Sequence, residues 1–159
     1  MAPVTSATYV AESEVFYKDG ITWLKKTGKP FTGVVIARYE NDGVFYKLSY
    51  QDGVRKGDWY IKVNRRATEE GTYIDCDPDL VAFIKKETGS DSCTLNLWRE
   101  AWREGFNNFV TLEIKSHVVF DDDTFFLIYT KYLKKYKGRY AQIIIYDGNL
   151  TSRVARSFP

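Results

Sequence analysis

Residues 28–59 read GKPFTGVVIARYENDGVFYKLSYQDGVRKGDW, and this stretch decides the fold of the first third of the chain. Short aliphatic and aromatic runs alternate with two turn sequences, Asn-Asp-Gly ending at Gly43 and Asp-Gly ending at Gly53. Glycine adopts the positive φ angles that tight hairpin turns require. Runs of β-branched and aromatic residues between such turns are typical of strands. We therefore predict an antiparallel β-meander here.

A helix is expected next in the chain. Asp77 suits its N-cap, and Pro78 suits the first helical position. The backbone N–H at that position has no partner within the helix, so proline, which lacks it, loses no hydrogen bond there. The apolar residues that follow recur at helical spacing, and Gly89 stands where a left-handed C-terminal residue is wanted. A second helix is predicted from Thr94 to about Gly105, and its apolar positions are Leu95, Trp98 and Trp102.

The last third returns to a period of two. Four runs, at 109–120, 123–133, 139–146 and 150–158, are separated by turn-like residues, which favours four antiparallel strands. The second run has a helical alternative, whose apolar face would consist of Ile128, Tyr132, Leu133 and Tyr136.

The predicted fold class is therefore α+β, with an N-terminal antiparallel β-meander, two helices and a C-terminal antiparallel β-meander. We expect a single domain over 1–159, because a chain of this length buries about 70% of its unfolded surface. Within it, the first meander covers 18–59, the helical segment 77–105 and the second sheet 109–156.

The glycine-punctuated stretch has a family resemblance. Its Lys-Pro-Phe-Thr-Gly phrase at 29–33, the turn at 39–43 and the Gln-Asp-Gly turn at 51–53 together resemble the MORN-like repeat of the bacterial YwqK type. The match extends over about residues 18–59. This resemblance implies a bacterial antitoxin or immunity protein and supplies no catalytic residue.

No catalytic, cofactor or metal site is predicted. His117 is the only histidine, and no glycine motif has the spacing of a phosphate-binding loop. Cys76 and Cys93 are too far apart in sequence for a Cys-x-x-Cys pair. Buried free thiols are expected for them, with a single disulfide as the alternative. The chain is therefore expected not to be an enzyme.

Charge is the feature that points to a partner. An acidic cluster and a basic, tyrosine-containing segment are expected in turns at opposite ends of the predicted sheet, and either end could dock a partner of opposite charge. The candidate partner-binding residues are Asp121, Asp122, Asp123, Lys131, Lys134, Lys135, Tyr136, Lys137 and Arg139.

Two functions are compatible with these residues. The first is a non-enzymatic protein that binds and blocks a toxin, as the family resemblance implies. The second is a nucleic-acid-binding domain that uses the Lys- and Tyr-rich hairpin at 129–140, with tyrosines stacked on bases. No apolar stretch reaches the roughly 20 residues of a membrane helix, and no signal-peptide pattern opens the sequence, so a cytoplasmic location is expected.

Overall fold

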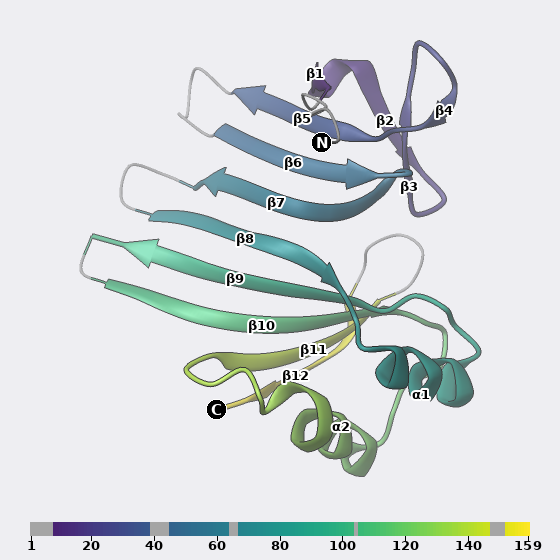
Figure 1. Cartoon of the computed structure of the whole chain (residues 1–159), viewed down its shortest axis with the longest axis vertical. Coiled ribbons are helices and arrows are strands. Elements are labelled where there is room, and N and C mark those ends of the chain that lie inside the picture. Colours follow the sequence, from purple (N-terminus) through teal and green to yellow (C-terminus); the bar gives the residue numbers. More distant parts are fainter. Residues whose placement is uncertain (1–7, 39–44, 64–66, 104, 147–151) are drawn as a thin grey trace, which may run out of the picture.

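A computed structural model describes residues 8–38, 45–63, 67–103, 105–146 and 152–159. The fold is mostly β, with 56% strand and 19% helix. In Figure 1 one large twisted sheet runs the length of the molecule, and two helices pack against its C-terminal end. A small second sheet lies beside the N-terminal strands of the large one.

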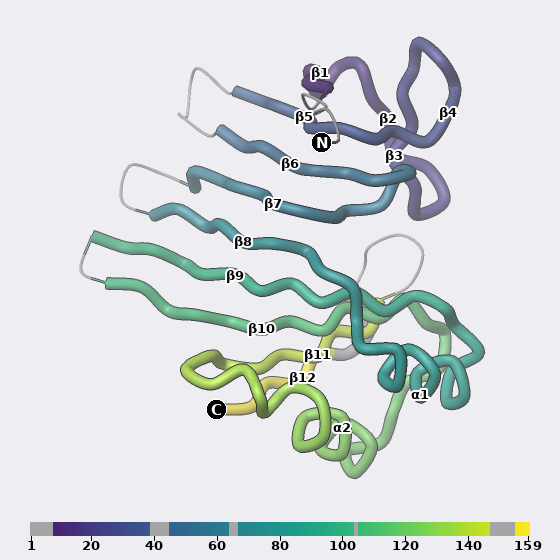
Figure 2. Tube along the Cα trace, in the orientation of Figure 1, coloured from purple at the N-terminus to yellow at the C-terminus, as the bar shows by residue number. Residues whose placement is uncertain are grey.

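Nine strands form the large sheet. Neighbouring strands are antiparallel, except that two junctions, β1 with β5 and β10 with β11, are parallel. In spatial order the strands are β1 (Tyr9–Ala11), β5 (Gly33–Arg38), β6 (Phe45–Gln51), β7 (Val54–Lys62), β8 (Ala67–Asp75), β9 (Thr94–Trp102), β10 (Gly105–Lys115), β11 (Tyr140–Tyr146) and β12 (Ser152–Phe158). Figure 2 shows that β5 to β10 lie side by side in the order of the sequence.

The small sheet is antiparallel and consists of β2 (Val15–Lys18), β3 (Ile21–Leu24) and β4 (Lys29–Pro30). A short 3₁₀ helix, η1 (Glu12–Glu14), precedes it. Backbone hydrogen bonds attach this sheet to the turn between β6 and β7: the N–H of Thr22 donates to the carbonyl of Gly53 at 2.9 Å, and the N–H of Gly53 donates to the carbonyl of Phe31 at 2.8 Å. The small sheet is therefore fixed to the middle of the chain's first meander.

The turn chemistry predicted for this region is confirmed at Gly53. Asp52 and Gly53 have φ angles of 50° and 80°, the paired positive values of a two-residue hairpin turn. A Cβ at Gly53 would collide with the side chain of Ile21, so glycine is also required by the close approach of the small sheet. The corresponding turn at Gly43 lies outside the described residues.

The first predicted helix is confirmed as α1 (Pro78–Thr88). Gly89 follows it with a φ of 75°, and its N–H donates to the carbonyl of Lys85 at 2.7 Å. Asp77 precedes α1 as predicted, but its carboxylate makes no capping hydrogen bond. It binds Lys135 instead, with a distance of 2.6 Å between the carboxylate oxygen and Nζ.

The main core lies between the helices and one face of β9, β10 and β11. Leu80 and Ile84, one turn apart on α1, and Phe125 and Ile128 on α2 (Asp122–Ile128) are buried against this face. The sheet contributes alternate residues, as expected for strands with one face on a core. These residues are Leu95, Val110, Leu112, Ile114, Ile143 and Ile145.

The helix predicted at 94–105 is wrong, because residues 94–102 form β9 in the centre of the sheet. Leu95 faces the helices, whereas Trp98 lies on the opposite face of the strand. A strand covered on both faces carries apolar residues at intervals of both two and three, so its pattern imitates a helical one. The helical segment of 77–105 is thus α1 followed by a strand.

The strand predicted at 123–133 is also wrong, and its helical alternative is correct. This run forms α2 and a π-helical turn, η2 (Tyr129–Leu133), which cross over between the parallel strands β10 and β11. A crossover is required there because parallel strands cannot be joined by a hairpin. Asp121 caps α2, since its carboxylate accepts a hydrogen bond from the N–H of Thr124 at 2.7 Å.

These differences overturn the predicted fold class. The molecule does not have two separate meanders with helices between them; it has one continuous mixed sheet, and its strand content is far above its helix content. The antiparallel sheet predicted at 109–156 is interrupted by a parallel pair. Its two outer parts, β10 and the hairpin of β11 with β12, belong to the same sheet as the first meander.

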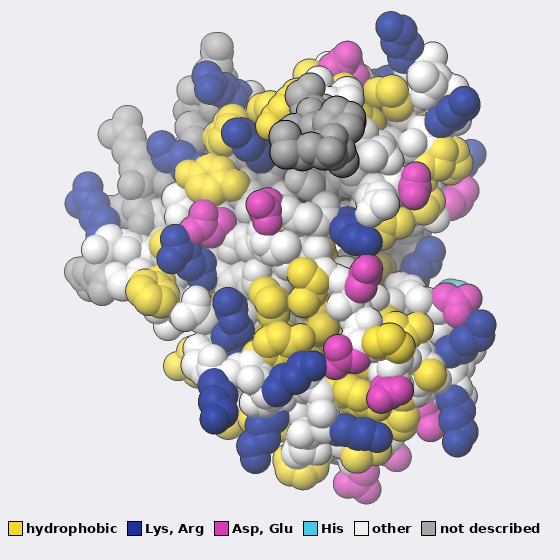
Figure 3. All heavy atoms as spheres, in the orientation of Figure 1, with side chains coloured by type: hydrophobic (Ala, Val, Ile, Leu, Met, Phe, Trp, Pro, Cys, Tyr) yellow, Lys and Arg dark blue, Asp and Glu magenta, His cyan; other side chains and the backbone are white. Residues whose placement is uncertain are grey.

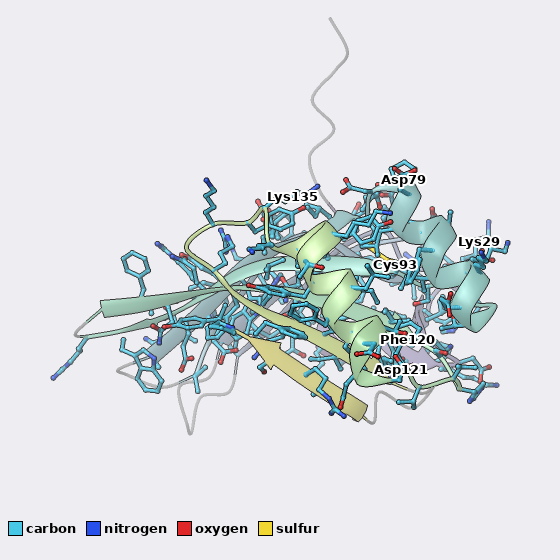
Figure 4. The ribbon with its side chains drawn as sticks, turned by 90° about the horizontal axis from the view of Figure 1, so that it is seen from below. Lys29, Asp79, Cys93, Phe120, Asp121 and Lys135 are labelled. Carbon is cyan, nitrogen blue, oxygen red and sulfur yellow. A yellow bond between two sulfur atoms is a disulfide. The ribbon has the colours of Figure 1, made fainter. Side chains whose placement is uncertain are left out.

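Cys76 and Cys93 form a disulfide, with their Cα atoms 6.2 Å apart. The expectation of free thiols is wrong, and the alternative of a single bridge is correct. The bridge joins the residue after β8 to the residue before β9, so it closes the connection that contains α1 (Figure 4). Among the described residues, no helix has the length and apolar character needed to cross a membrane.

Candidate functional site

The predicted acidic cluster serves the N-terminus of α2. Asp121 caps the helix, and the hydrogen bonds from Thr124 lower the pKa of its carboxyl. Asp122 pairs with Arg156 of β12, with 3.2 Å between the carboxylate oxygen and Nε. Asp122 and Asp123 also lie in the first helical turn, where negative charge complements the helix dipole. This cluster is thus largely accounted for by local structure.

Two of the basic residues also have structural partners. Lys135 binds Asp77, and this hydrogen bond raises the pKa of its ammonium group. Arg139 donates from one guanidinium nitrogen to the carbonyls of Trp98 and Phe109, at 3.2 and 3.0 Å. Lys135 and Arg139 therefore tie the segment after α2 to α1 and to the sheet.

Lys134, Lys137 and Arg139 line a surface cavity of about 330 Å³, which we call the basic cavity. Figure 3 shows Lys and Arg side chains gathered around this end of the molecule. Asp121 and Lys135 lie at opposite ends of α2 in Figure 4, so the acidic cluster does not join this surface. Lys131 instead lies over the ring of Tyr132, at 5.4 Å. The predicted residues that line the basic cavity are Lys134, Tyr136, Lys137 and Arg139.

A second and larger cavity, of about 450 Å³, lies between the small sheet and the large one. Its charged and aromatic lining consists of Tyr17, Tyr50, Arg55, Tyr73, Glu113 and Tyr146. We call it the tyrosine cavity. Of the residues predicted as partner-binding, none lines it.

Strand alternation explains why these residues meet. Glu113 stands between Leu112 and Ile114, both of which face the helices, so its own side chain belongs to the opposite face of β10. Register places Glu113 beside Ile144 of β11. The register of β6 and β7 shifts between Leu48 and Tyr50, where β7 carries the extra residues, and this irregularity brings Tyr50 opposite Arg55 of β7. The hairpin of β2 and β3 covers this face and adds Tyr17, Gly20 and Thr22.

Glu113 is a buried carboxyl group with an incomplete set of hydrogen bonds. Burial raises its pKa, and this effect is partly offset by a hydrogen bond from the hydroxyl of Tyr73 and by the positive charge of Arg55. Its second oxygen, Oε2, is buried and has no hydrogen-bond partner among the described residues. Burial and the neighbouring Glu113 raise the pKa of Tyr73, so the Tyr73 hydroxyl keeps its proton and remains a donor.

Arg55 is held by aromatic rings. The central carbon of its guanidinium lies 4.7 Å from the ring centroid of Tyr73, 5.8 Å from that of Trp59 and 5.9 Å from that of Tyr50. Each of these contacts is within the range of a cation–π interaction. The Nε atom of Arg55 is buried without a hydrogen-bond partner in the described part of the chain. The rings fix the position of the guanidinium but supply no acceptor for it.

The other two tyrosines complete the wall. Burial raises the pKa of both Tyr17 and Tyr146, and Tyr146 is hydrogen-bonded to Ser92. Their hydroxyls are therefore protonated at neutral pH and can donate or accept hydrogen bonds. The described residues contain no group of His, Cys, Asp and Glu side chains that could hold a metal ion. The chemistry that the tyrosine cavity offers is binding, through one acid, one base and four phenol rings.

Sequence reasoning missed this site, although one signal was present. Glu113 interrupts the run at 109–114, whose other residues are apolar or threonine, and a carboxylate in such a run is unusual on a covered face. Arg55 and Tyr73 carry no comparable signal, because charged and aromatic residues are common in exposed hairpins. The chain matches no family model, and no curated protein or solved structure matches it either.

Proposed function

We propose that this chain is a binding protein for a small molecule, and that the ligand occupies the tyrosine cavity. One observation carries the proposal: Glu113 and Arg55 both line this cavity, and each has a buried polar atom without a hydrogen-bond partner. Leaving such an atom unpaired costs about 1–3 kcal/mol, so native proteins leave few of them. A bound ligand with both a donor and an acceptor would remove both costs.

The size and lining of the cavity support the same proposal. Small-molecule sites are concave, mostly apolar, and carry a small number of polar groups that fix the orientation of the ligand. The tyrosine cavity has this character, because ring faces, Val54 and Ile144 surround one carboxyl and one guanidinium group. Its volume of about 450 Å³ is suited to a small metabolite.

A library screen tests this function. We expect thermal unfolding of the wild-type chain to shift upward with at least one small polar metabolite, because a ligand that binds only the folded state stabilises it. Ile144→Trp places a bulky side chain in the cavity and is expected to abolish these shifts. Thr130→Trp, at an exposed position on η2, is the matched control and should retain them. Equal responses of all three proteins would reject the tyrosine cavity as the site.

A protein partner at the basic cavity is a second candidate, in line with the toxin-blocking function that the family resemblance implies. Its supporting observation is that Lys134, Tyr136 and Lys137 gather around a hollow of about 330 Å³. Tyrosine is a common anchor of protein interfaces, and the charge of the two lysines would steer an acidic partner toward it. Base stacking by this segment has less support, because Tyr129 stacks on Phe158 at 4.5 Å and Tyr132 is buried.

Charge reversal tests this second candidate. We expect the triple variant Lys131→Glu, Lys134→Glu and Lys137→Glu to weaken binding of a candidate toxin about tenfold or more, mainly through slower association. Lys135 is left intact because it pairs with Asp77. Surface binding at two salt concentrations measures the effect.

The matched control for this test reverses three exposed lysines near the β3–β4 turn, which are Lys25, Lys26 and Lys29. It changes net charge by the same amount and should bind the toxin as the wild type does. Equal losses in both triple variants would indicate a general charge effect and would remove the basic cavity from consideration. Salt-sensitive binding of a single-stranded oligonucleotide, lost only in the first variant, would favour the nucleic-acid alternative.

The disulfide bears on the cellular location of either function. Disulfides persist in oxidising compartments and are rare in the cytosol. The Cys76–Cys93 bridge therefore favours an oxidising compartment over the cytoplasmic location expected from the sequence.

A further inference from the structure

The tyrosine cavity contains one acidic and one basic side chain that are not paired with each other. The charge of Arg55 lowers the pKa of Glu113, so the two groups are neighbours. Nevertheless, the ion pairs found among the described residues do not include a bridge between Arg55 and Glu113. The cavity therefore presents two separate charged groups rather than one neutral pair.

We propose that the ligand is a small zwitterion of the amino-acid type, with its ammonium group at the carboxylate of Glu113 and its carboxylate at the guanidinium of Arg55. This inference rests on the proposed small-molecule function. Charge-assisted hydrogen bonds of this kind are roughly twice as strong as neutral ones. A ligand with both groups satisfies both side chains at once.

Simpler ions satisfy only half of the site. An anion would pair with Arg55 and leave the buried carboxyl of Glu113 with an unpaired oxygen. An amine would pair with Glu113 and leave Nε of Arg55 without an acceptor. A nucleobase offers donors and acceptors, but it carries no charge to compensate a buried carboxylate. Only the zwitterion matches both the number and the sign of the charges.

The hydrogen bonds around Glu113 fit an ammonium partner. Tyr73 donates to one carboxylate oxygen, which leaves the second for the ligand. Because this second oxygen is buried, its contact with the ligand involves rotation about the terminal torsion of Glu113, which is soft in glutamate. The tyrosine rings add a further attraction, because ring faces favour cations. The remaining lining, with Val54, Ile144 and the ring of Tyr17, favours a ligand whose side chain is aliphatic or aromatic.

Calorimetry with the full chain tests the inference, and the probes are free amino acids with aliphatic or aromatic side chains. We expect binding of the free amino acid, and a loss of about 30-fold or more when its amine is acetylated or its carboxylate is converted to an amide. These capped ligands test both contacts on the unchanged protein, so the result does not depend on how a variant folds.

Two substitutions locate the contacts. Glu113→Gln and Arg55→Gln should each weaken binding by about 30-fold or more, because each removes one charge from the cavity. Glu69→Gln is the matched control and should bind as the wild type does. Glu69 is a carboxyl on the same face of the sheet whose pKa is also raised, chiefly by burial and then by Glu100, but it lies outside the cavity.

The outcomes separate the two levels of the proposal. Binding of nucleosides in place of amino acids, lost in Ile144→Trp, would overturn the zwitterion and leave the small-molecule function intact. If an amino acid binds with the same affinity after its amine is acetylated and after its carboxylate is converted to an amide, the zwitterion is also overturned. If neither the amino acids nor the metabolite library binds, both the inference and the proposed function fail.

Discussion

Replacing Cys76 and Cys93 by serine is expected to lower the free energy of unfolding by about 3 kcal/mol. The bridge spans 17 residues of sequence, and a cross-link across a loop of this length restricts the unfolded chain by about that amount. The loop contains α1, which supplies Leu80 and Ile84 to the main core. The unbridged protein thus keeps the same folded contacts but gives up more chain entropy on folding. Equilibrium unfolding in urea measures the difference.

A reducing agent provides the control for this prediction. It should destabilise the wild type by a similar amount and leave the serine variant unchanged, since the variant has no bridge to reduce. Labelling of both cysteine thiols would show that the bridge has been reduced. If the urea midpoint of this reduced wild type equals that of the oxidised protein, the bridge contributes no stability.

Trp98→Ala is expected to cost about 3 kcal/mol of stability. The indole N–H of Trp98 donates to the hydroxyl of Thr111 at 2.9 Å, and its ring stacks on Phe109 with centroids 4.4 Å apart. A Cβ on Gly71 would collide with the Cβ of Trp98 and the carbonyl of Leu97, so this glycine allows β8 to approach β9 closely at Trp98. Truncation therefore removes a large ring, a hydrogen bond and a stacking contact from the centre of the sheet. Thermal and urea unfolding measure the loss.

Trp102→Ala is the matched control, because both residues are tryptophans on the same face of β9. Trp102 stands at the end of the strand and is 49% exposed. Its truncation is expected to change stability by less than about 0.5 kcal/mol. Similar losses for the two variants would contradict the packing difference that the structure assigns to them.

Local turn and cap chemistry could be predicted from the sequence. The Asp52-Gly53 turn and the stop at Gly89 depend on the φ angles that glycine adopts, and these requirements are the same in most folds. Pro78 likewise marks the start of α1 correctly. Predictions of this kind succeed because their cause lies within a few residues.

The two wrong elements depend on tertiary structure. β9 is covered on both faces, so Leu95 and Trp98 are both packed although they point in opposite directions. The run at 123–133 alternates well enough for a strand, and the decision for a helix comes from the capping by Asp121 and from the parallel neighbour strand. The spacing of apolar residues in a sequence reflects which side chains are buried. When a strand is buried on both faces, its apolar residues no longer alternate, and the period of two that identifies a strand is lost.

The tyrosine cavity also depends on tertiary structure, and for this reason the sequence did not predict it. Its acid, its base and its rings come from six strands, and only the register of the large sheet and the position of the small sheet bring them together. The charge clusters at 121–123 and 131–139 were conspicuous because they are contiguous in sequence. Contiguous charges are often caps and surface pairs, as Asp121 and Lys135 are here.

The order of strands has a consequence for how the molecule assembles. From β5 to β10, each strand pairs with the next strand in the chain, and apart from β8 and β9, which are joined through α1, these pairs close short loops at little entropic cost and form early. The small sheet attaches to this platform mainly by a few backbone hydrogen bonds at Thr22 and Gly53. Such a unit detaches at lower free energy than the sheet unfolds. Brief release of the β2–β3 hairpin therefore offers a ligand a way into the cavity while the nine strands stay paired.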